Sequence, residues 1–299
     1  MTKVSEQELW KKIQKSRYTY TAAKAKNSSN PGSVPEEYLY VDCGCFLHNG
    51  KVHEVKLPSR CVIIGKQAFE GCQFQKEVKF PEGLKFIGER AFAGNHRLRR
   101  VHFPRSLLKI GKGGYGACNN LISAEFDAES PIKVIPEALF EECVRLAKVQ
   151  LPQQVEIIRR RAFYRCKELK VLEIPKTLRE VEQEAFYFCA LEELNLPDTM
   201  ERIGDSAFFR CKMLREVKIP KSVKYIGRWA FHGCSRLEVV EILHEPAYIG
   251  EWITNKSCRI RCLPGGKVDQ YCEEYGLVRE YVQESEKMTE EAHERTAGE

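Results

Sequence analysis

The chain has 299 residues, of which 43% are hydrophobic and 30% charged, the composition of an ordinary globular protein. It contains no run of about 18 apolar residues, which argues against a membrane span, and residues 1–16 lack the apolar stretch of a secretory signal, so we expect a cytoplasmic protein. The formal net charge is +6, and Lys and Arg are interleaved with Glu through most of the chain, which favours a mixed, solvated surface.

The N-terminal segment is predicted to be a short helix followed by a linker. Residues 5–8 form a capping box, so residues 5–16 are expected to be helical. A partner-binding or membrane-surface role of this basic arm stays open beside a plain docked helix. Asn27–Pro35 has the composition of a linker. We therefore assign residues 1–36 to an N-terminal helix and linker.

Residues 37–58 are predicted to form a hairpin-like first coil that turns at Asn49-Gly50. The segment also contains four residues of types that bind zinc: Cys43, Cys45, His48 and His53. Their spacing fits no common zinc site, so we expect no metal and no cofactor.

An aromatic residue followed three positions later by a small residue recurs between residues 69 and 231. The aromatic residues are Phe69, Phe92, Tyr115, Phe140, Phe163, Phe186, Phe208 and Phe231. The small residues are Cys72, Asn95, Cys118, Cys143, Cys166, Cys189, Cys211 and Cys234. The repeats are 22, 23 or 25 residues long. A fixed period of this size indicates a solenoid of stacked coils.

The repeat at residues 191–211 begins with a predicted strand. Leu194 and Leu196 alternate around the outward Asn195, as in a strand with one buried face. Pro197 has no N–H group and ends the strand. Every repeat carries an equivalent apolar pair, so we predict one such strand per coil.

The second half of this repeat is predicted to hold two turns. Gly204 is expected to permit a tight turn with a positive φ, and a short helical turn is expected to carry Ala207 and Phe208 into the core. The repeat around residues 124–140 is two residues longer, so we expect a local bulge there.

Seven of the thirteen cysteines occupy the small position of the repeat. We interpret this column as a ladder of small buried side chains. Parallel side chains on adjacent coils have poor disulfide geometry, and Asn95 fills the same position in one repeat. These thiols are therefore expected to be reduced.

The segment Gly111–Gly116 matches the dinucleotide pattern G-x-G-x-x-G. However, Gly111 occupies the turn glycine of the repeat, and Gly114 replaces its small alanine. We interpret the match as part of the repeat. No catalytic grouping stands out elsewhere, and we predict a protein that is not an enzyme.

The repeat resembles the BspA-type leucine-rich repeat, whose unit reads L-x-x-(V/L)-x-(I/L)-P-x-x-(V/L)-x-x-I-G-x-x-A-F-x-x-C. Residues 84–104 and 223–242 carry the resemblance most plainly, and it covers about residues 50–280. It implies an α/β repeat fold: a leucine-rich-repeat solenoid with a parallel β-sheet on one face and short helical turns opposite. It also implies contact with host or matrix proteins, and a cell-surface or secreted location as the alternative to the cytoplasm.

Residues 258–277 resemble the closing segment of that family. A last strand and a Gly-rich turn are expected to lead into a helix around Val268–Tyr275, which Gly276 ends. We assign residues 37–281 to the solenoid with its caps. Residues 282–299 are assigned to an acidic, disordered tail.

Function is expected on the sheet face, because a solenoid offers an extended surface to partners. The central outward residues of that face, which we predict to bind a partner, are Lys79, His102, Glu125, Gln150, Glu173, Asn195, Lys218 and Glu241. The column has no aromatic row for stacking bases, which argues against nucleic acid. We predict non-enzymatic, adhesion-like protein–protein interaction. Binding of nucleic acid or an anionic surface through the basic body and N-terminal arm is the alternative.

Overall fold

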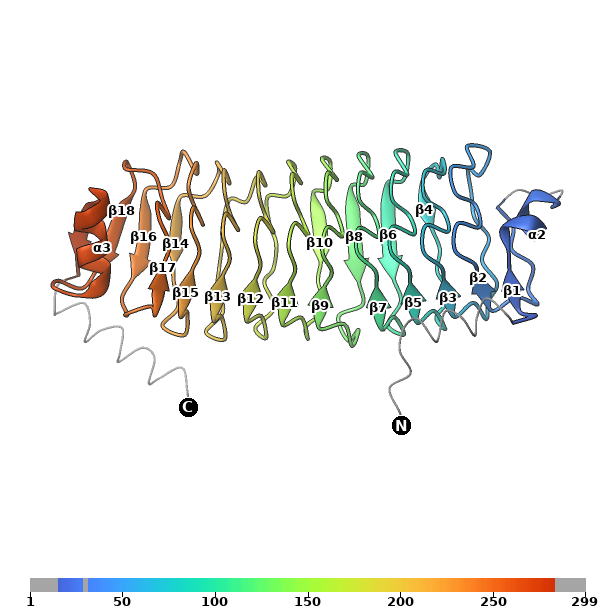
Figure 1. The fold of residues 1–299 in the computed structure, drawn as a ribbon, viewed down its shortest axis with the longest axis horizontal. Coiled ribbons are helices and arrows are strands. Elements are labelled where there is room, and N and C mark those ends of the chain that lie inside the picture. Colours follow the sequence, from blue (N-terminus) through green and yellow to red (C-terminus); the bar gives the residue numbers. More distant parts are fainter. Residues whose placement is uncertain (1–15, 29–31, 283–299) are drawn as a thin grey trace.

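The computed structural model describes residues 16–28 and 32–282, which form a row of stacked coils, a parallel β-solenoid (Figure 1). Each full coil has two straight segments, which supply the two columns of strands, and one turn segment. The predicted helix at residues 5–16, apart from its last residue, and the predicted tail beyond residue 282 lie outside the described residues. Within the described ranges, no helix is long and apolar enough to cross a membrane.

The first column of strands runs along the stack as two parallel sheets. One sheet contains β1 (Thr19–Tyr20), β2 (Tyr40–Val41), β3 (Ile63–Ile64), β5 (Phe86–Ile87) and β7 (Lys109–Ile110). The other contains β9 (Val134–Ile135), β11 (Ile157–Ile158), β12 (Glu180–Val181), β13 (Arg202–Ile203), β15 (Tyr225–Ile226) and β17 (Tyr248–Ile249). The two sheets separate at the longer repeat, where residues 127–133 form a loop between β8 and β9.

The second column of strands, whose outer surface we call the sheet face, also forms two parallel sheets. The N-terminal one contains β4 (Glu77–Val78), β6 (Arg100–Phe103), β8 (Ser123–Phe126) and β10 (Lys148–Gln150). The C-terminal one contains β14 (Glu216–Lys218), β16 (Val239–Ile242), β18 (Arg259–Cys262) and β19 (Val278–Tyr281).

The strands predicted around Leu172 and Leu194 are wrong. Residues 171–175 and 191–197 continue the stack between β10 and β14 without forming strands. In the described chain, no backbone hydrogen bond joins these two segments, and one bond beside them runs from Glu192 N to Lys170 O, just before the first segment, at 2.9 Å. The inward side chains Leu172 and Leu194 are still buried. The alternating apolar side chains of these segments are therefore buried although their backbones form no ladder of hydrogen bonds.

The expected helical turns around the core aromatic residues are also wrong. These segments are turns, and the helices within the described residues are α2 (Ala22–Lys26) and α3 (Lys267–Tyr275). A residue with positive φ lies two positions before and two positions after each core aromatic; around Phe163 these are Arg161 (φ 57°) and Arg165 (φ 60°). A helix does not tolerate such left-handed residues.

The alternating backbone conformation turns every second N–H group along the axis of the stack. Arg161 N donates to Gln183 O at 3.1 Å, and Phe163 N donates to Ala185 O at 2.8 Å. The same bonds recur between successive coils, as from Phe186 N to Ala207 O. The turn segments thus form a third hydrogen-bonded ladder, which we call the turn ladder.

The turn glycines serve a different purpose from the predicted one. Gly204 and Gly227 do not have a positive φ. A Cβ on Gly204 would lie 2.6 Å from Gln183 N and 2.7 Å from the Glu182 carbonyl carbon. On Gly227 it would lie 2.5 Å from the carbonyl carbon of Gly204. At Gly204 and Gly227 the backbones of adjacent coils approach too closely for a Cβ.

The inward side chains of all three segments fill one continuous core. Phe163, Phe186, Phe208 and Phe231 are fully buried and stack in register, with centroids 5.1, 5.3 and 5.3 Å apart. Burying each such side chain contributes on the order of 1.5–3 kcal/mol. The stack is therefore held together by side-chain burial as well as by its ladders.

The first coil is parallel and not hairpin-like. β2 pairs in parallel with both β1 and β3, although the turn at Asn49 forms, with Val52 N donating to Asn49 O at 3.1 Å. β1 and the buried Tyr20 extend the stack before residue 37. The coil at this end therefore includes part of the segment predicted to be a helix and linker.

The C-terminal cap agrees with its prediction. Helix α3 spans Lys267–Tyr275 and is capped by Gly276, which adopts a left-handed conformation with φ 61°. Tyr271 and Cys272 are buried against the last coil. This short helix closes the end of the core.

Candidate functional site

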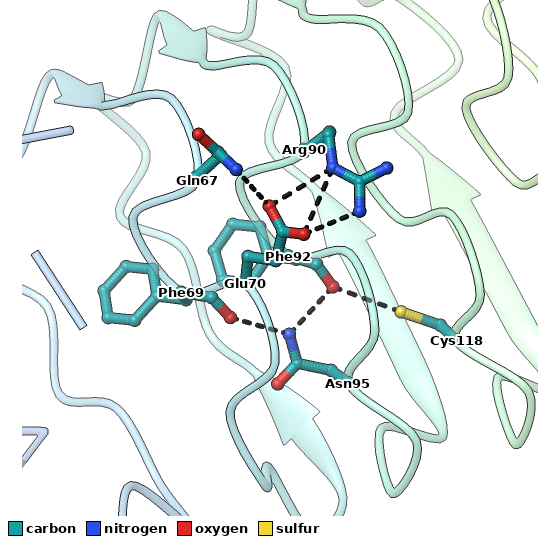
Figure 2. Close-up of polar contacts among 7 residues, drawn as sticks. All are labelled: Gln67, Phe69, Glu70, Arg90, Phe92, Asn95 and Cys118. Carbon is teal, nitrogen blue, oxygen red and sulfur yellow. Dashed lines mark hydrogen bonds and ion pairs between the residues drawn. The ribbon is translucent and has the colours of Figure 1, made fainter. Parts of the chain in front are cut away.

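The small position of the repeat is a hydrogen-bond donor and not only a small buried side chain. Cys118 Sγ lies 3.2 Å from Phe92 O, the carbonyl of the core aromatic residue one coil earlier (Figure 2). Asn95 Nδ2 donates to Phe69 O at 2.9 Å and to Phe92 O at 2.8 Å. The same donation, at 3.1–3.3 Å, is made by Cys72, Cys143, Cys166, Cys189, Cys211 and Cys234. Cysteine and asparagine at this position thus both donate a hydrogen bond to a buried backbone carbonyl.

Burial also makes these thiols chemically inert. It raises the pKa of the Cys72 and Cys118 thiols to about 12 and that of Cys166 well above the ordinary range. A protonated thiol is a poor nucleophile and a poor metal ligand. All thirteen cysteines are free. The column is therefore structural.

We expect alkaline pH to destabilise the fold through these thiols. An unfolded cysteine loses its proton above about pH 8.5, whereas the folded thiol of Cys118 keeps it to about pH 12. The thiol's contribution to stability is thus complete below pH 8.5 and decreases as the pH rises toward 12. Denaturant unfolding at about pH 7 and pH 10 should show this decrease. Cys118→Asn has no thiol to titrate, so its loss of unfolding free energy between pH 7 and pH 10 should be smaller by about 2 kcal/mol. The same loss in this variant and in the unchanged protein would contradict the thiol as its source.

Two possible ligand sites considered from the sequence do not assemble. In the part of the chain that the structure describes, no group of three His, Cys, Asp or Glu side chains could hold a metal ion. The Cys45 Sγ atom instead lies 3.4 Å from Tyr20 O. Gly111–Gly116 belongs to a turn segment after β7, with no long helix behind it.

Charged side chains of neighbouring coils pair along much of the surface. Lys66 pairs with Glu89 at 3.1 Å, and Lys112 pairs with Glu137 at 3.1 Å. Near the N-terminal coils, the buried Glu70 accepts hydrogen bonds from Gln67 and Arg90 (Figure 2). Much of the basic charge is therefore neutralised internally, which weakens the nucleic-acid alternative.

The structure brings the predicted sheet-face residues together in two groups. Lys79, His102, Glu125 and Gln150 line a hollow of about 410 Å³ over β4 to β10. Asn195, Lys218 and Glu241 line a second hollow of about 1400 Å³. Glu173 is exposed on the stretch between them and lines neither.

The charged side chains at the smaller hollow already pair with one another. Glu125 contacts His102 Nδ1 at 3.2 Å and Lys148 Nζ at 3.0 Å. The hydrogen bond from Lys148 holds the pKa of the Glu125 carboxylate below its usual value. A partner carboxylate or amine would have to displace these contacts before it could bind.

The larger hollow lies where the second column lacks strands, between residues 191–197 and β14. Among the described strands, β14 is the edge strand of its sheet and pairs with β16 alone. Residues 191–197 of the preceding coil lie next to β14 in the stack without forming a strand. The charged side chains lining this hollow are Glu192, Glu193, Asp198, Glu216, Glu241, Arg215, Lys218, Lys221 and Arg236. Its apolar lining comes from Leu194, Leu196, Met213, Ile219, Pro220 and Leu243.

Glu241 does not project freely from this face. It is 8% exposed and pairs with Arg261 at 2.9 Å and with Lys218 at 3.5 Å. Arg261 also pairs with Glu280 at 2.7 Å. Glu241 therefore belongs to a structural ion-pair network at the rim of the hollow, in contrast to the exposed Asn195.

A row of aromatic side chains outside the core was not predicted from the sequence. Tyr164, Tyr187, Phe209 and His232 each follow a core phenylalanine, and their rings stack at 4.9, 4.9 and 5.9 Å. All four are half-buried on the turn segments. The signal was visible as a second aromatic or imidazole ring after Ala-Phe in four successive repeats.

Comparisons with known proteins agree with this architecture. A family model described as the BspA type leucine-rich repeat region matches residues 40–133 and 133–261, in six copies. A leucine-rich repeat protein from Bacteroides ovatus has a similar structure, with a TM-score of 0.64, 21% identity, and coverage of 80% of this chain and 64% of its own. The chain thus spans less than two thirds of that protein. No curated protein gives a match.

Two further solved structures are more distant. A leucine-rich cell surface protein from Faecalibacterium prausnitzii is 18% identical, with a TM-score of 0.42 over 85% of this chain and 88% of its own. The pneumococcal vaccine antigen PcpA is 15% identical, with a TM-score of 0.48 over 89% of this chain and 83% of its own.

Proposed function

Because the chain belongs to the BspA-type leucine-rich repeat family, we propose that it is a non-enzymatic module that binds a protein through its sheet face. The observation that carries the proposal is the hollow of about 1400 Å³ beside the edge strand β14. A stack of coils displays such a surface without any catalytic machinery.

The lining of this hollow fits a protein partner. Leucine, isoleucine and methionine side chains lie among carboxylates and guanidinium groups. An apolar centre with a charged rim is the usual composition of a protein interface. No histidine or cysteine is among the described residues that line it. Binding is therefore the use that we propose for it.

The compartment of the protein decides which partners it can meet. The N-terminal sequence predicts the cytoplasm, whereas the family resemblance predicts the cell surface, and the two compartments contain different partners. Fractionation of cells that express the full chain distinguishes the two locations.

Photo-crosslinking tests the sheet face directly. A photo-reactive residue in place of the exposed Asn195 should form an adduct with the partner, whereas one in place of the exposed Gln183, on a turn segment, should not. Arg215→Glu with Arg236→Glu should abolish the Asn195 adduct, because both arginines line the hollow.

Arg97→Glu with Arg99→Glu makes the same charge change elsewhere on the surface, at a separate hollow, and should leave the adduct intact. Identical adducts at Asn195 and Gln183 would contradict the assignment of the sheet face.

A further inference from the structure

Two arginines on the turn segments have guanidinium groups with no acidic partner. Within residues 16–28 and 32–282, neither Arg210 nor Arg228 uses its guanidinium in a hydrogen bond or an ion pair. Both side chains are exposed. This contrasts with the many arginines of the same surface that pair with glutamate on an adjacent coil.

Aromatic rings hold these two guanidinium groups in place. The Arg210 guanidinium carbon lies 5.0 Å from the Phe188 ring centroid and 5.4 Å from that of Phe209. The Arg228 guanidinium carbon lies 4.5 Å from the ring centroid of Trp229, which is 39% exposed. Stacked arginines keep their N–H donors in a fixed plane, ready for a planar acceptor.

The chain itself shows which acceptor suits this position. Arg165 occupies the same place in its repeat as Arg210, two residues after the core phenylalanine, and pairs with Glu142 of the preceding coil at 3.1 Å. In the repeats on either side of Arg210, this position holds Phe188 and Gly233. Arg210 therefore lacks the carboxylate that Arg165 has.

The neighbouring rings favour a carboxylate over a flat ligand. Tyr187 and Phe209 stack face to face at 4.9 Å with an interplanar angle of 10°, so their inner faces cover each other. The rims of aromatic rings carry positive partial charge. A nucleobase or sugar needs an open ring face, whereas a carboxylate is attracted by ring rims and guanidinium groups together.

We propose that the turn segments bind an extended acidic segment of a partner protein at two positions, Arg210 with Phe188 and Phe209, and Arg228 with Trp229, which together we call the turn-face patch. Carboxylates of that segment pair with the two guanidinium groups, as Glu142 pairs with Arg165 within the chain. The patch lies on the turn segments and shares no residue with the sheet-face hollow. It is therefore independent of the function proposed above.

Fluorescence anisotropy with the full chain tests this patch. The probe is a labelled peptide of about eight residues that alternates Glu and Ser, long enough when extended to span several coils. The control probe has Gln in place of each Glu. We expect binding of the Glu peptide only, and a loss of about tenfold in affinity when both arginines are changed, Arg210→Gln with Arg228→Gln.

Arg97→Gln with Arg99→Gln removes the same charge at a separate hollow, outside both proposed surfaces, and should leave the affinity unchanged. Equal binding of the Glu and Gln peptides, no binding of either, or an equal loss in both double variants would overturn the proposal. Tighter binding of a free peptide of residues 283–299 than of the Glu peptide would make this chain's own acidic segment the occupant, and would overturn the assignment to a partner.

Discussion

Replacing Phe186 by alanine should lower the free energy of unfolding by about 3–5 kcal/mol. The ring is fully buried and stacks on Phe163 at 5.1 Å and on Phe208 at 5.3 Å, with interplanar angles of 5° and 3°. Its removal leaves a cavity between two coils whose backbones are fixed by the turn ladder, so the neighbours have little freedom to close it. Equilibrium unfolding in denaturant measures the loss.

Tyr187→Ala is the matched control for this variant. Tyr187 is the next residue, carries a ring of similar size and also stacks at 4.9 Å on both sides, but it is only half-buried. We expect it to cost about 1 kcal/mol. Equal losses for the two variants would show that the inner stack of rings is not the main source of cohesion.

Gly227→Ala should cost about 3 kcal/mol or more, although it adds a single methyl group. A Cβ at this position would lie 2.5 Å from the carbonyl carbon of Gly204 on the adjacent coil. Backbone atoms held by ladders on both sides have little freedom to move away, so the coils must separate locally. Thermal and denaturant unfolding report the cost.

Gly50→Ala provides the control for the added methyl group. No atom lies within 4 Å of a Cβ built at Gly50, and its φ is not positive. We expect a change of less than about 0.5 kcal/mol there. A small effect at Gly227 as well would mean that the coils are not packed as closely as the structure describes.

The sequence was sufficient to predict the stacked coils and the C-terminal cap. Side-chain periodicity reports which positions face inward, and the buried Phe186 and Cys189 follow that pattern. The helix ending at Gly276 was predicted from the same kind of local chemistry. In each case a residue type has a strong preference for one environment, which is why its pattern alone was informative.

The conformation of the turn segments could not be predicted in this way. Arg161, Arg165 and Glu142 adopt positive φ values, yet residues of these types have no special preference for them. Hydrogen bonds to the adjacent coils determine this conformation, and the sequence of a single repeat does not indicate those bonds. The Ala-Phe pair was consequently interpreted as part of a helical turn.

The candidate site was only partly visible for a similar reason. The repeat period placed Asn195 and Lys218 on one face correctly, but the absence of strands at residues 191–197 depends on hydrogen bonding between coils. Glu241 was expected to be an outward residue, whereas Arg261, from the next strand of the sheet, draws it into an ion pair. Interactions across the stack decide such details.

Amide hydrogen exchange tests the turn ladder most directly. The N–H groups of Phe163 and Phe186 donate at 2.8 Å to Ala185 O and Ala207 O of the next coils. We expect both amides to be among the most protected in the chain, exchanging only when the stack opens. Exchange of these two amides as fast as that of the loop around Gly50 would contradict a ladder that joins every coil to the next.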